Sequence, residues 1–227
     1  MALIYPENMK SQEITAFFTD REVSTEVDEL LRLSGFRKIY LPIQKHTDRV
    51  KIIQKGDEIS EPVIADGVIT TLEGLLIGVK TADCVPVLIS STCSSVVAAV
   101  HAGWRGTARL ILKKTLQTMI DRFSLSADDI LIAIGPSIRG CCYEVGREVA
   151  ESIGSSCSTD ALVRARKGRL YVDLVEANLL QATATGIPEE NIWVSKSCTC
   201  CERDRFFSYR ATKTEKRQGG FIGIKSP

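Results

Sequence analysis

Residues 95–123, SVVAAVHAGWRGTARLILKKTLQTMIDRF, contain the clearest structural unit of the chain. The apolar run at 95–100 predicts a buried strand, and the glycines that follow His101 predict a turn. Apolar residues then recur over 107–123 at i, i+4, i+7 and i+8, which predicts a helix with one face in the core. A strand, a glycine-bearing turn and a helix in succession are typical of an α/β protein.

The rest of the chain can be divided in the same way. No linker rich in Pro, Gly or Ser and no internal repeat divides the 227 residues, so we expect a single domain over 1–227. Strands and helices alternate irregularly, which predicts the α/β (α+β) class with a mixed sheet. We expect further strands at 38–43, 68–71, 75–79, 85–89, 130–134, 192–194, 206–212 and 220–224, and further helices at 26–33, 144–153 and 173–185.

Composition limits the classes of function. The 29 Lys and Arg residues balance 28 Asp and Glu residues, and a net charge of +1 indicates no nucleic-acid partner. The apolar runs are far shorter than the ~20 residues that span a bilayer, and the first ten residues do not resemble a secretory signal. We therefore expect a cytoplasmic protein without membrane contact, whose eight cysteines are reduced thiols.

His46 and His101 are the only two histidines of the chain, and each follows a predicted strand. His101 precedes Ala-Gly-Trp-Arg-Gly, where two glycines would let the backbone approach a ligand and the helix start would offer unpaired N–H groups. Arg105 adds a positive charge there. This turn suits an anion such as phosphate, and the alternative is an ordinary strand-to-helix connection with a solvated arginine.

Cys84 has three interpretations: a buried small hydrophobic residue, a metal ligand, or a nucleophile activated by His101. Cys84, His46 and His101 form a trio that suits zinc, because two imidazoles and one thiolate leave the fourth tetrahedral position for water or substrate. Two histidines cannot supply the imidazoles of a multicopper oxidase.

The other ionisable candidates are less specific. Asp66, Asp83 and Glu144 could transfer protons or orient a ligating histidine, or could be solvated turn residues. A structural zinc or iron–sulfur site could form if two distant cysteine segments met, although we assign them no C-x-x-C pattern. These segments contain Cys141, Cys142, Cys198, Cys200 and Cys201.

Several sequence blocks closely resemble the YfiH/laccase-domain family, often labelled polyphenol oxidase. They are Gln44-x-His46, Lys80-Thr-Ala-Asp-Cys84-Val-Pro-Val, Val100-His-Ala-Gly-Trp-Arg-Gly-Thr107, Ile134-Gly-Pro-Ser-Ile138, Cys142-Tyr-Glu-Val-Gly146 and Phe206-Phe-Ser-Tyr-Arg210. The resemblance implies a layered α-β-β-α fold around a mixed sheet. It also implies a zinc ion held by His46, Cys84 and His101, with copper as the alternative metal.

The same resemblance implies a purine nucleoside phosphorylase that cleaves adenosine, inosine or methylthioadenosine with phosphate, and that can also deaminate adenosine. Its partners would be a small-molecule nucleoside and phosphate. Cys84, His101 and Arg105 would be catalytic, and Arg105, Gly106 and Arg210 would bind phosphate. The alternatives are a Cys–His hydrolase or amidase that uses Cys84 and His101, and a copper-binding, polyphenol oxidase-like oxidoreductase. The oligomeric state stays open.

Overall fold

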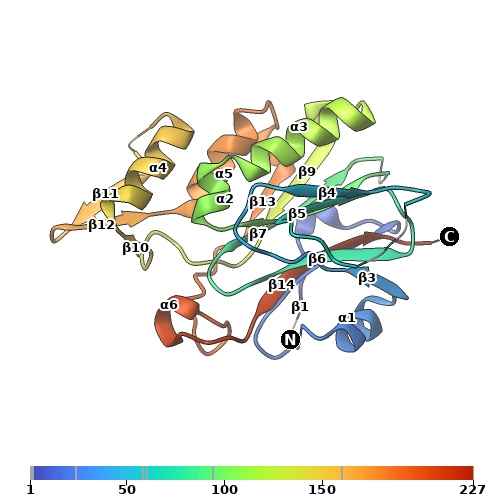
Figure 1. Cartoon of the computed structure of the whole chain (residues 1–227), viewed down its shortest axis with the longest axis horizontal. Coiled ribbons are helices and arrows are strands. Elements are labelled where there is room, and N and C mark those ends of the chain that lie inside the picture. The colour runs from blue at the N-terminus through green and yellow to red at the C-terminus, as the bar shows by residue number, and fades with distance from the viewer. Residues whose placement is uncertain are drawn as a thin grey trace.

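The structure is a computed structural model that describes residues 3–23, 25–57, 59, 61–93, 95–159 and 161–226. Figure 1 shows two β-sheets stacked face to face, with several helices over the first sheet and one helix below the second. The α/β class and the expected α-β-β-α layering are confirmed. Among the described residues no helix is both long and apolar enough to cross a membrane.

The first sheet carries six strands and holds the centre of the molecule. β7 pairs antiparallel with β8 and β9, whereas the two outer pairs, β13 with β9 and β4 with β5, are parallel. The sheet is therefore mixed. Its strands in spatial order are β13 (Ile192–Val194), β9 (Ile130–Ile134), β7 (Val85–Ser91), β8 (Val97–Ala102), β5 (Gly67–Thr70) and β4 (Val50–Ile53).

The second sheet has five strands, and its centre depends on close backbone contact. A Cβ atom at Gly78 of β6 would lie 2.2 Å from the ring of Phe221 on β14, so only glycine fits there. β3 runs parallel to β6 and the other pairs are antiparallel. The spatial order is β1 (Leu3–Ile4), β2 (Ile14–Thr19), β14 (Gln218–Ile224), β6 (Leu75–Thr81) and β3 (Lys38–Tyr40).

The helices cover the outer faces of the two sheets. α3 and α5 lie over the six-stranded sheet, and α1 lies below the five-stranded sheet (Figure 1). A small sheet extends from one end of the molecule, with β12 (Arg169–Val172) between β10 (Glu144–Val145) and β11 (Val163–Arg166). The α-helices are α1 (Val27–Ser34), α2 (Trp104–Ala108), α3 (Ile111–Phe123), α4 (Arg147–Cys157), α5 (Leu174–Thr183) and α6 (Tyr209–Thr212), and short 3-10 helices span Glu7–Met9, Ala127–Asp129 and Glu189–Asn191.

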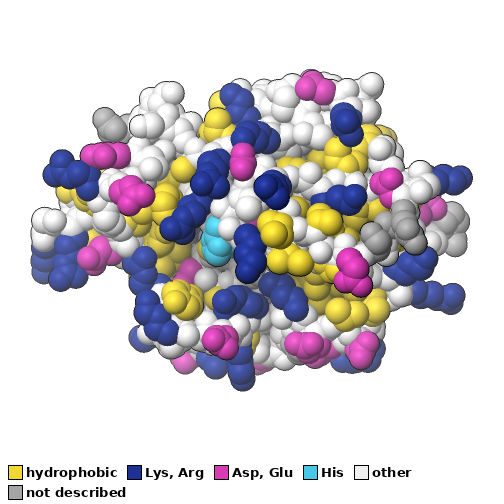
Figure 2. Space-filling model, in the orientation of Figure 1, with side chains coloured by type: hydrophobic (Ala, Val, Ile, Leu, Met, Phe, Trp, Pro, Cys, Tyr) yellow, Lys and Arg dark blue, Asp and Glu magenta, His cyan; other side chains and the backbone are white. Residues whose placement is uncertain are grey.

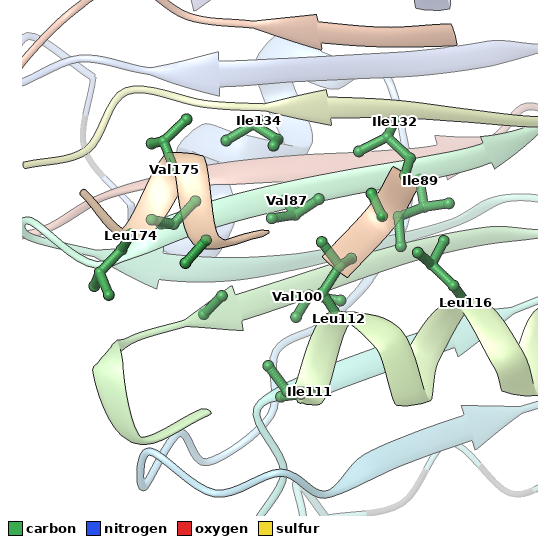
Figure 3. Close-up of a cluster of buried hydrophobic side chains, with 14 of the residues drawn as sticks. Val87, Ile89, Val100, Ile111, Leu112, Leu116, Ile132, Ile134, Leu174 and Val175 are labelled. Carbon is green, nitrogen blue, oxygen red and sulfur yellow. The ribbon is translucent and has the colours of Figure 1, made fainter. Parts of the chain in front are cut away.

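Three hydrophobic clusters correspond to the three interfaces between the layers. The largest joins the six-stranded sheet to its helices, and in Figure 3 Val87 and Val100 point toward Leu112 of α3. The second lies between the sheets and contains Phe18 and Leu88, and the third joins α1 to the five-stranded sheet. β7 is buried along its whole length and is apolar over residues 85–89, because both of its faces are covered.

Three expectations about secondary structure were wrong. The helix expected over 144–153 begins only at Arg147, because Glu144 and Val145 pair with β12 as strand β10. The single helix expected over 107–123 is two helices, because Leu110 has a left-handed φ of 64° and interrupts the chain between α2 and α3. The strand expected at 206–212 does not form: residues 209–212 are α6, since the Ser208 side chain accepts a hydrogen bond from the N–H of Ala211 and caps a helix there. Arg210 therefore lies in a helical turn. His101 lies within β8, because this strand continues to Ala102 instead of ending at residue 100.

Candidate metal centre and its cavity

The three predicted metal ligands lie together at one edge of the six-stranded sheet. The donor atoms of His46, Cys84 and His101 all lie within 4.8 Å of one another. Nε2 of His46 is 3.9 Å from Sγ of Cys84, and the two imidazole rings meet edge to face with their centroids 5.0 Å apart. Three segments that are distant in sequence therefore form one cluster.

The register of β7 and β8 brings Cys84 close to His101. Pro86 lies opposite His101 and Val85 lies opposite Ala102, so Cys84 comes next to Gly103. A Cβ atom at position 103 would lie 3.0 Å from the Cys84 sulfur and 3.0 Å from Cδ2 of His46. Glycine at this position allows the three donors to approach.

A buried carboxylate holds the loop that carries His46. Asp66 is 0% exposed, and its oxygens accept the backbone N–H groups of Lys45, His46 and Thr47 at 3.2, 3.0 and 2.6 Å. These bonds support the left-handed φ of 56° at His46. Oδ1 of Asp66 also lies 2.8 Å from Nδ1 of His101, which leaves Nε2 of that ring for a metal. Asp66 thus orients both histidines.

Gln44 fixes the other end of this loop. Its side-chain amide donates to the carbonyl of Lys80 and accepts the N–H of the same residue, both at 2.8 Å. The amide therefore joins the His46 loop to the end of β6, as a neighbouring strand would. This contact explains the use of glutamine in the Gln-x-His block.

Cys84 and His101 stabilise each other's charged forms. Burial opposes ionisation of the Cys84 thiol, but the charge of His101 and hydrogen bonds from both imidazoles outweigh it and lower the pKa of Cys84 to about 6. Burial likewise opposes the charged form of His101, whereas the Cys84 thiolate and Asp66 raise the pKa of His101 to about 9. Near neutral pH the pair is a thiolate beside an imidazolium, so a bound metal must displace the His101 proton.

The donor set and its spacing fit one zinc ion. With bond lengths of about 2.0 Å to nitrogen and 2.3 Å to sulfur, a tetrahedral site would place these atoms about 3.5 Å apart. The observed 3.9 Å is close to that value. Three protein donors would leave one coordination position of such an ion open for water or substrate, and all three residues line a cavity.

That cavity has a volume of about 730 Å³, within the range of small-molecule sites. Figure 2 shows an imidazole in a hollow of the surface with Lys and Arg side chains around it. Cations and aromatic rings dominate the lining, so the cavity suits an anion together with a flat ring system. These residues are Lys80, Arg210, Lys213 and Arg217, and Trp104, Tyr143 and Tyr209.

Asp83 and Arg210 connect two walls of the cavity. Oδ1 of Asp83 accepts the hydroxyl of Thr199 at 2.7 Å, and Oδ2 accepts the N–H of Arg210 at 2.6 Å. The Arg210 guanidinium donates to the carbonyl of Glu144 at 2.6 Å and lies 5.0 Å from the centre of the Tyr143 ring. The positive charge is thereby held next to an aromatic side chain.

The other predicted residues lie in different surroundings. Arg105 is exposed outside the cavity lining, and its guanidinium stacks 4.3 Å from the centre of the Trp104 ring. Gly106 is buried within α2, where a Cβ atom would lie 3.3 Å from the carbonyl oxygen of Thr47. The Glu144 carboxylate pairs with Arg169 at 3.0 Å on the small sheet.

Sequence reasoning missed several lining residues. Lys80 begins the Lys-Thr-Ala-Asp-Cys84 block and could have been inferred from that block. Lys213 and Arg217 follow the segment at 206–212, and no role was predicted for them from the sequence. Gly103 was expected only to let the backbone approach a ligand, whereas the structure packs it against Cys84 and His46.

Solved structures of other proteins have the same fold. The chain is similar to YlmD from Geobacillus stearothermophilus, with a TM-score of 0.87, 27% sequence identity, and coverage of 100% of this chain and 97% of that chain. The α-β-β-α fold is that of the YfiH and YlmD proteins.

The chain belongs to the family described as multi-copper polyphenol oxidoreductase laccase, which matches residues 18–225. It is 40% identical over 186 residues to a protein of Aquifex aeolicus (strain VF5) named purine nucleoside phosphorylase, covering 82% of each chain. It is 38% identical over 182 residues to adenosine deaminase RL5 from an unknown prokaryotic organism, covering 76% of this chain and 69% of that one. The names of these relatives indicate that the chain is an enzyme.

Proposed function

We propose that this chain is a zinc-dependent purine nucleoside phosphorylase with adenosine, inosine or methylthioadenosine as its nucleoside and phosphate as its second substrate. The observation that carries the proposal is the combination of an open His46–Cys84–His101 donor set with a cationic, aromatic cavity of about 730 Å³. The names of the two relatives support the same substrate class.

In phosphorolysis a phosphate oxygen forms a bond to C1′ of the ribose while the bond from C1′ to the purine nitrogen breaks. The electron pair of that bond leaves with the purine, which then takes up a proton. Positive charge develops on the sugar in the transition state, and a phosphate held nearby stabilises it. The residues that bind phosphate are therefore catalytically important.

Arg210 is the best placed phosphate ligand, since its guanidinium lies in the cavity and is oriented by Glu144 and Tyr143. Lys80 and Lys213 supply further charge. Arg105 and Gly106 belong to α2, whose first N–H groups have no acceptor within the helix. We propose that Arg105 acts from the rim: burial raises the pKa of Tyr143 to about 12, and the charges of Arg210 and Arg105 partly oppose this rise, so the Arg105 charge reaches a residue of the cavity.

The aromatic side chains of the cavity suit the base. Trp104, Tyr143 and Tyr209 offer apolar ring faces against which a purine can stack. Zinc held by His46, Cys84 and His101 would supply Lewis-acid polarisation of an oxygen atom. Deamination of adenosine, in which water replaces the amino group at C6 and ammonia leaves, is a second activity of the same site in this proposal.

A Cys–His hydrolase is the second candidate. One observation favours it, namely the Cys84 thiolate beside the His101 imidazolium. His46 discriminates between the two proposals, because a dyad of Cys84 and His101 has no need of a third ligand. A copper-binding oxidoreductase would use the same three donors with a single copper ion.

The test measures bound metal and then separates the products formed from adenosine with and without phosphate. We expect zinc, phosphate-dependent release of adenine and ribose 1-phosphate, and some inosine. His46→Ala should abolish both zinc binding at this site and turnover, whereas the exposed helix variant Lys113→Ala should resemble the wild type. Absence of product from every purine nucleoside would refute the proposal, and full activity of metal-free His46→Ala would favour the hydrolase.

A further inference from the structure

Four cysteines form a second cluster, away from the His46 centre. Cys141 and Cys142 lie in the segment between β9 and β10, and Cys198 and Cys201 lie in the loop between β13 and α6. Their sulfur atoms all lie within 4.8 Å of one another. We propose that these four thiolates bind a structural zinc ion.

The distances between the sulfurs match a single ion. Cys141 lies 3.7 Å from Cys142 and 3.5 Å from each of Cys198 and Cys201, and Cys142 lies 3.3 Å from Cys201. Zinc–sulfur bonds of about 2.3 Å in a tetrahedron give sulfur–sulfur distances of about 3.8 Å. A disulfide would require about 2.05 Å, and thiolates bound to the separate irons of a cluster would lie farther apart.

The Cys198 segment has the local geometry of a metal-binding turn. Cys198 and Cys201 are separated by Thr199 and Cys200, which is a C-x-x-C spacing that the extra cysteine concealed. The N–H of Arg139 donates to the Cys198 sulfur at 3.4 Å, and the N–H groups of residues 200 and 201 also interact with it. N–H groups directed at a thiolate orient it and stabilise its charge.

The four sulfur donors suit a divalent ion. Binding of such an ion would release one proton from each thiol that was protonated, and the resulting thiolates would neutralise its charge. Four cysteines complete the tetrahedron, so the site is closed and has a structural role.

The cysteine cluster is adjacent in sequence to residues that line or support the cavity. Tyr143, a cavity residue, follows directly after Cys142. Thr199, which donates to Asp83 beside the metal ligand Cys84, follows directly after Cys198. A short bridge between Ser137 and Cys198 already joins the two segments. Zinc would lock both segments and thereby position one wall of the cavity.

The test compares zinc content of the purified full-length chain and its variants after dialysis against metal-free buffer. Cys142→Ser and Cys198→Ser should each contain about one zinc ion per chain less than the wild type, whichever metal occupies the His46 site. His101→Ala should keep the cluster zinc. The matched controls Cys200→Ser and Cys93→Ser should retain the wild-type content, because neither sulfur belongs to the cluster.

Alkylation of the native wild type provides a second measurement if the serine variants do not fold. Cys141 and Cys201 are exposed, as is Cys93. With zinc bound, Cys141 and Cys201 should be alkylated at least ten-fold more slowly than after chelation, whereas Cys93 should react at the same rate in both states. Equal zinc content in wild type and both cluster variants, equal alkylation rates with and without zinc, or iron as the bound metal would overturn the proposal.

Discussion

Asp66 lies 2.8 Å from Nδ1 of His101, and the same carboxylate accepts the backbone N–H of His46 at 3.0 Å. One buried side chain thus orients two ligands of the candidate metal centre, one through its ring and the other through its backbone. A hydrogen bond of this kind fixes the tautomer of the ligating histidine and increases its basicity.

The Asp66→Asn variant tests this relationship. The amide cannot carry the negative charge that holds His101, so we expect zinc affinity to fall about 10- to 100-fold. Competition with a chromophoric chelator measures the affinity. Asp121→Asn on the exposed face of α3 should leave it unchanged. Equal affinities for the two variants would show that Asp66 does not support the centre.

Gly103→Ala tests the close packing of the three donors. The added methyl group would lie 3.0 Å from both the Cys84 sulfur and the His46 ring, so we expect weaker zinc binding in a folded protein. Gly146→Ala is the matched control. Both glycines are N-cap residues with φ near −70° (−70° and −74°), but a methyl group at position 146 meets nothing within 4 Å. Calorimetric titration with zinc should separate the two variants.

A third prediction concerns the interface between the sheets. Leu88 of β7 is fully buried, and its Cδ2 atom lies 3.4 Å from where a Cβ atom at Gly220 of β14 would be. Leu88→Ala should lower the free energy of unfolding by about 2–5 kcal/mol, because it leaves a cavity between the layers. Leu180→Ala, at a position 41% exposed, should change it by less than about 0.5 kcal/mol. Urea denaturation measures both values.

Local patterns were sufficient to predict much of the fold. The expected strands at 130–134 and 192–194 have the bounds of β9 and β13, since apolar β-branched runs there end at turns or polar residues. The interruption at Leu110 was missed because neither glycine nor proline marks it. The segment at 206–212 was misassigned because its three aromatic residues are typical of a strand, whereas the Ser208 cap determines the helix.

The candidate site was predictable only in part, for a related reason. The resemblance identified His46, Cys84 and His101, and the structure brings their donor atoms together. Their assembly depends on the pairing of β7 with β8 and on Asp66, whose bonds cross some twenty or more residues of sequence. Contacts of this kind are tertiary, and no local pattern predicts them. The zinc ligand roles and the one-domain organisation stay predictions.

The ionisation of Cys84 can be measured in metal-free protein. A pKa of about 6 means that the thiolate, and therefore the alkylation rate of Cys84, should fall with a midpoint near pH 6 as the pH decreases. An ordinary cysteine has its midpoint at about 8.5. Mass spectrometry of the peptide that contains Cys84 follows the reaction. Asp66→Asn should move the midpoint upward because His101 loses the partner that stabilises its positive charge.

Arg210 provides the final prediction, which concerns the proposed phosphate site. Arg210→Met keeps much of the side-chain volume but removes the guanidinium from the cavity, so we expect KM for phosphate to rise at least about ten-fold. KM for the nucleoside should change less, because the aromatic residues that would contact the base remain. Arg122→Met in the last turn of α3 is the control for loss of one positive charge. Equal phosphate KM values for both variants would place the phosphate elsewhere, with Lys80 and Lys213 the next cations to test.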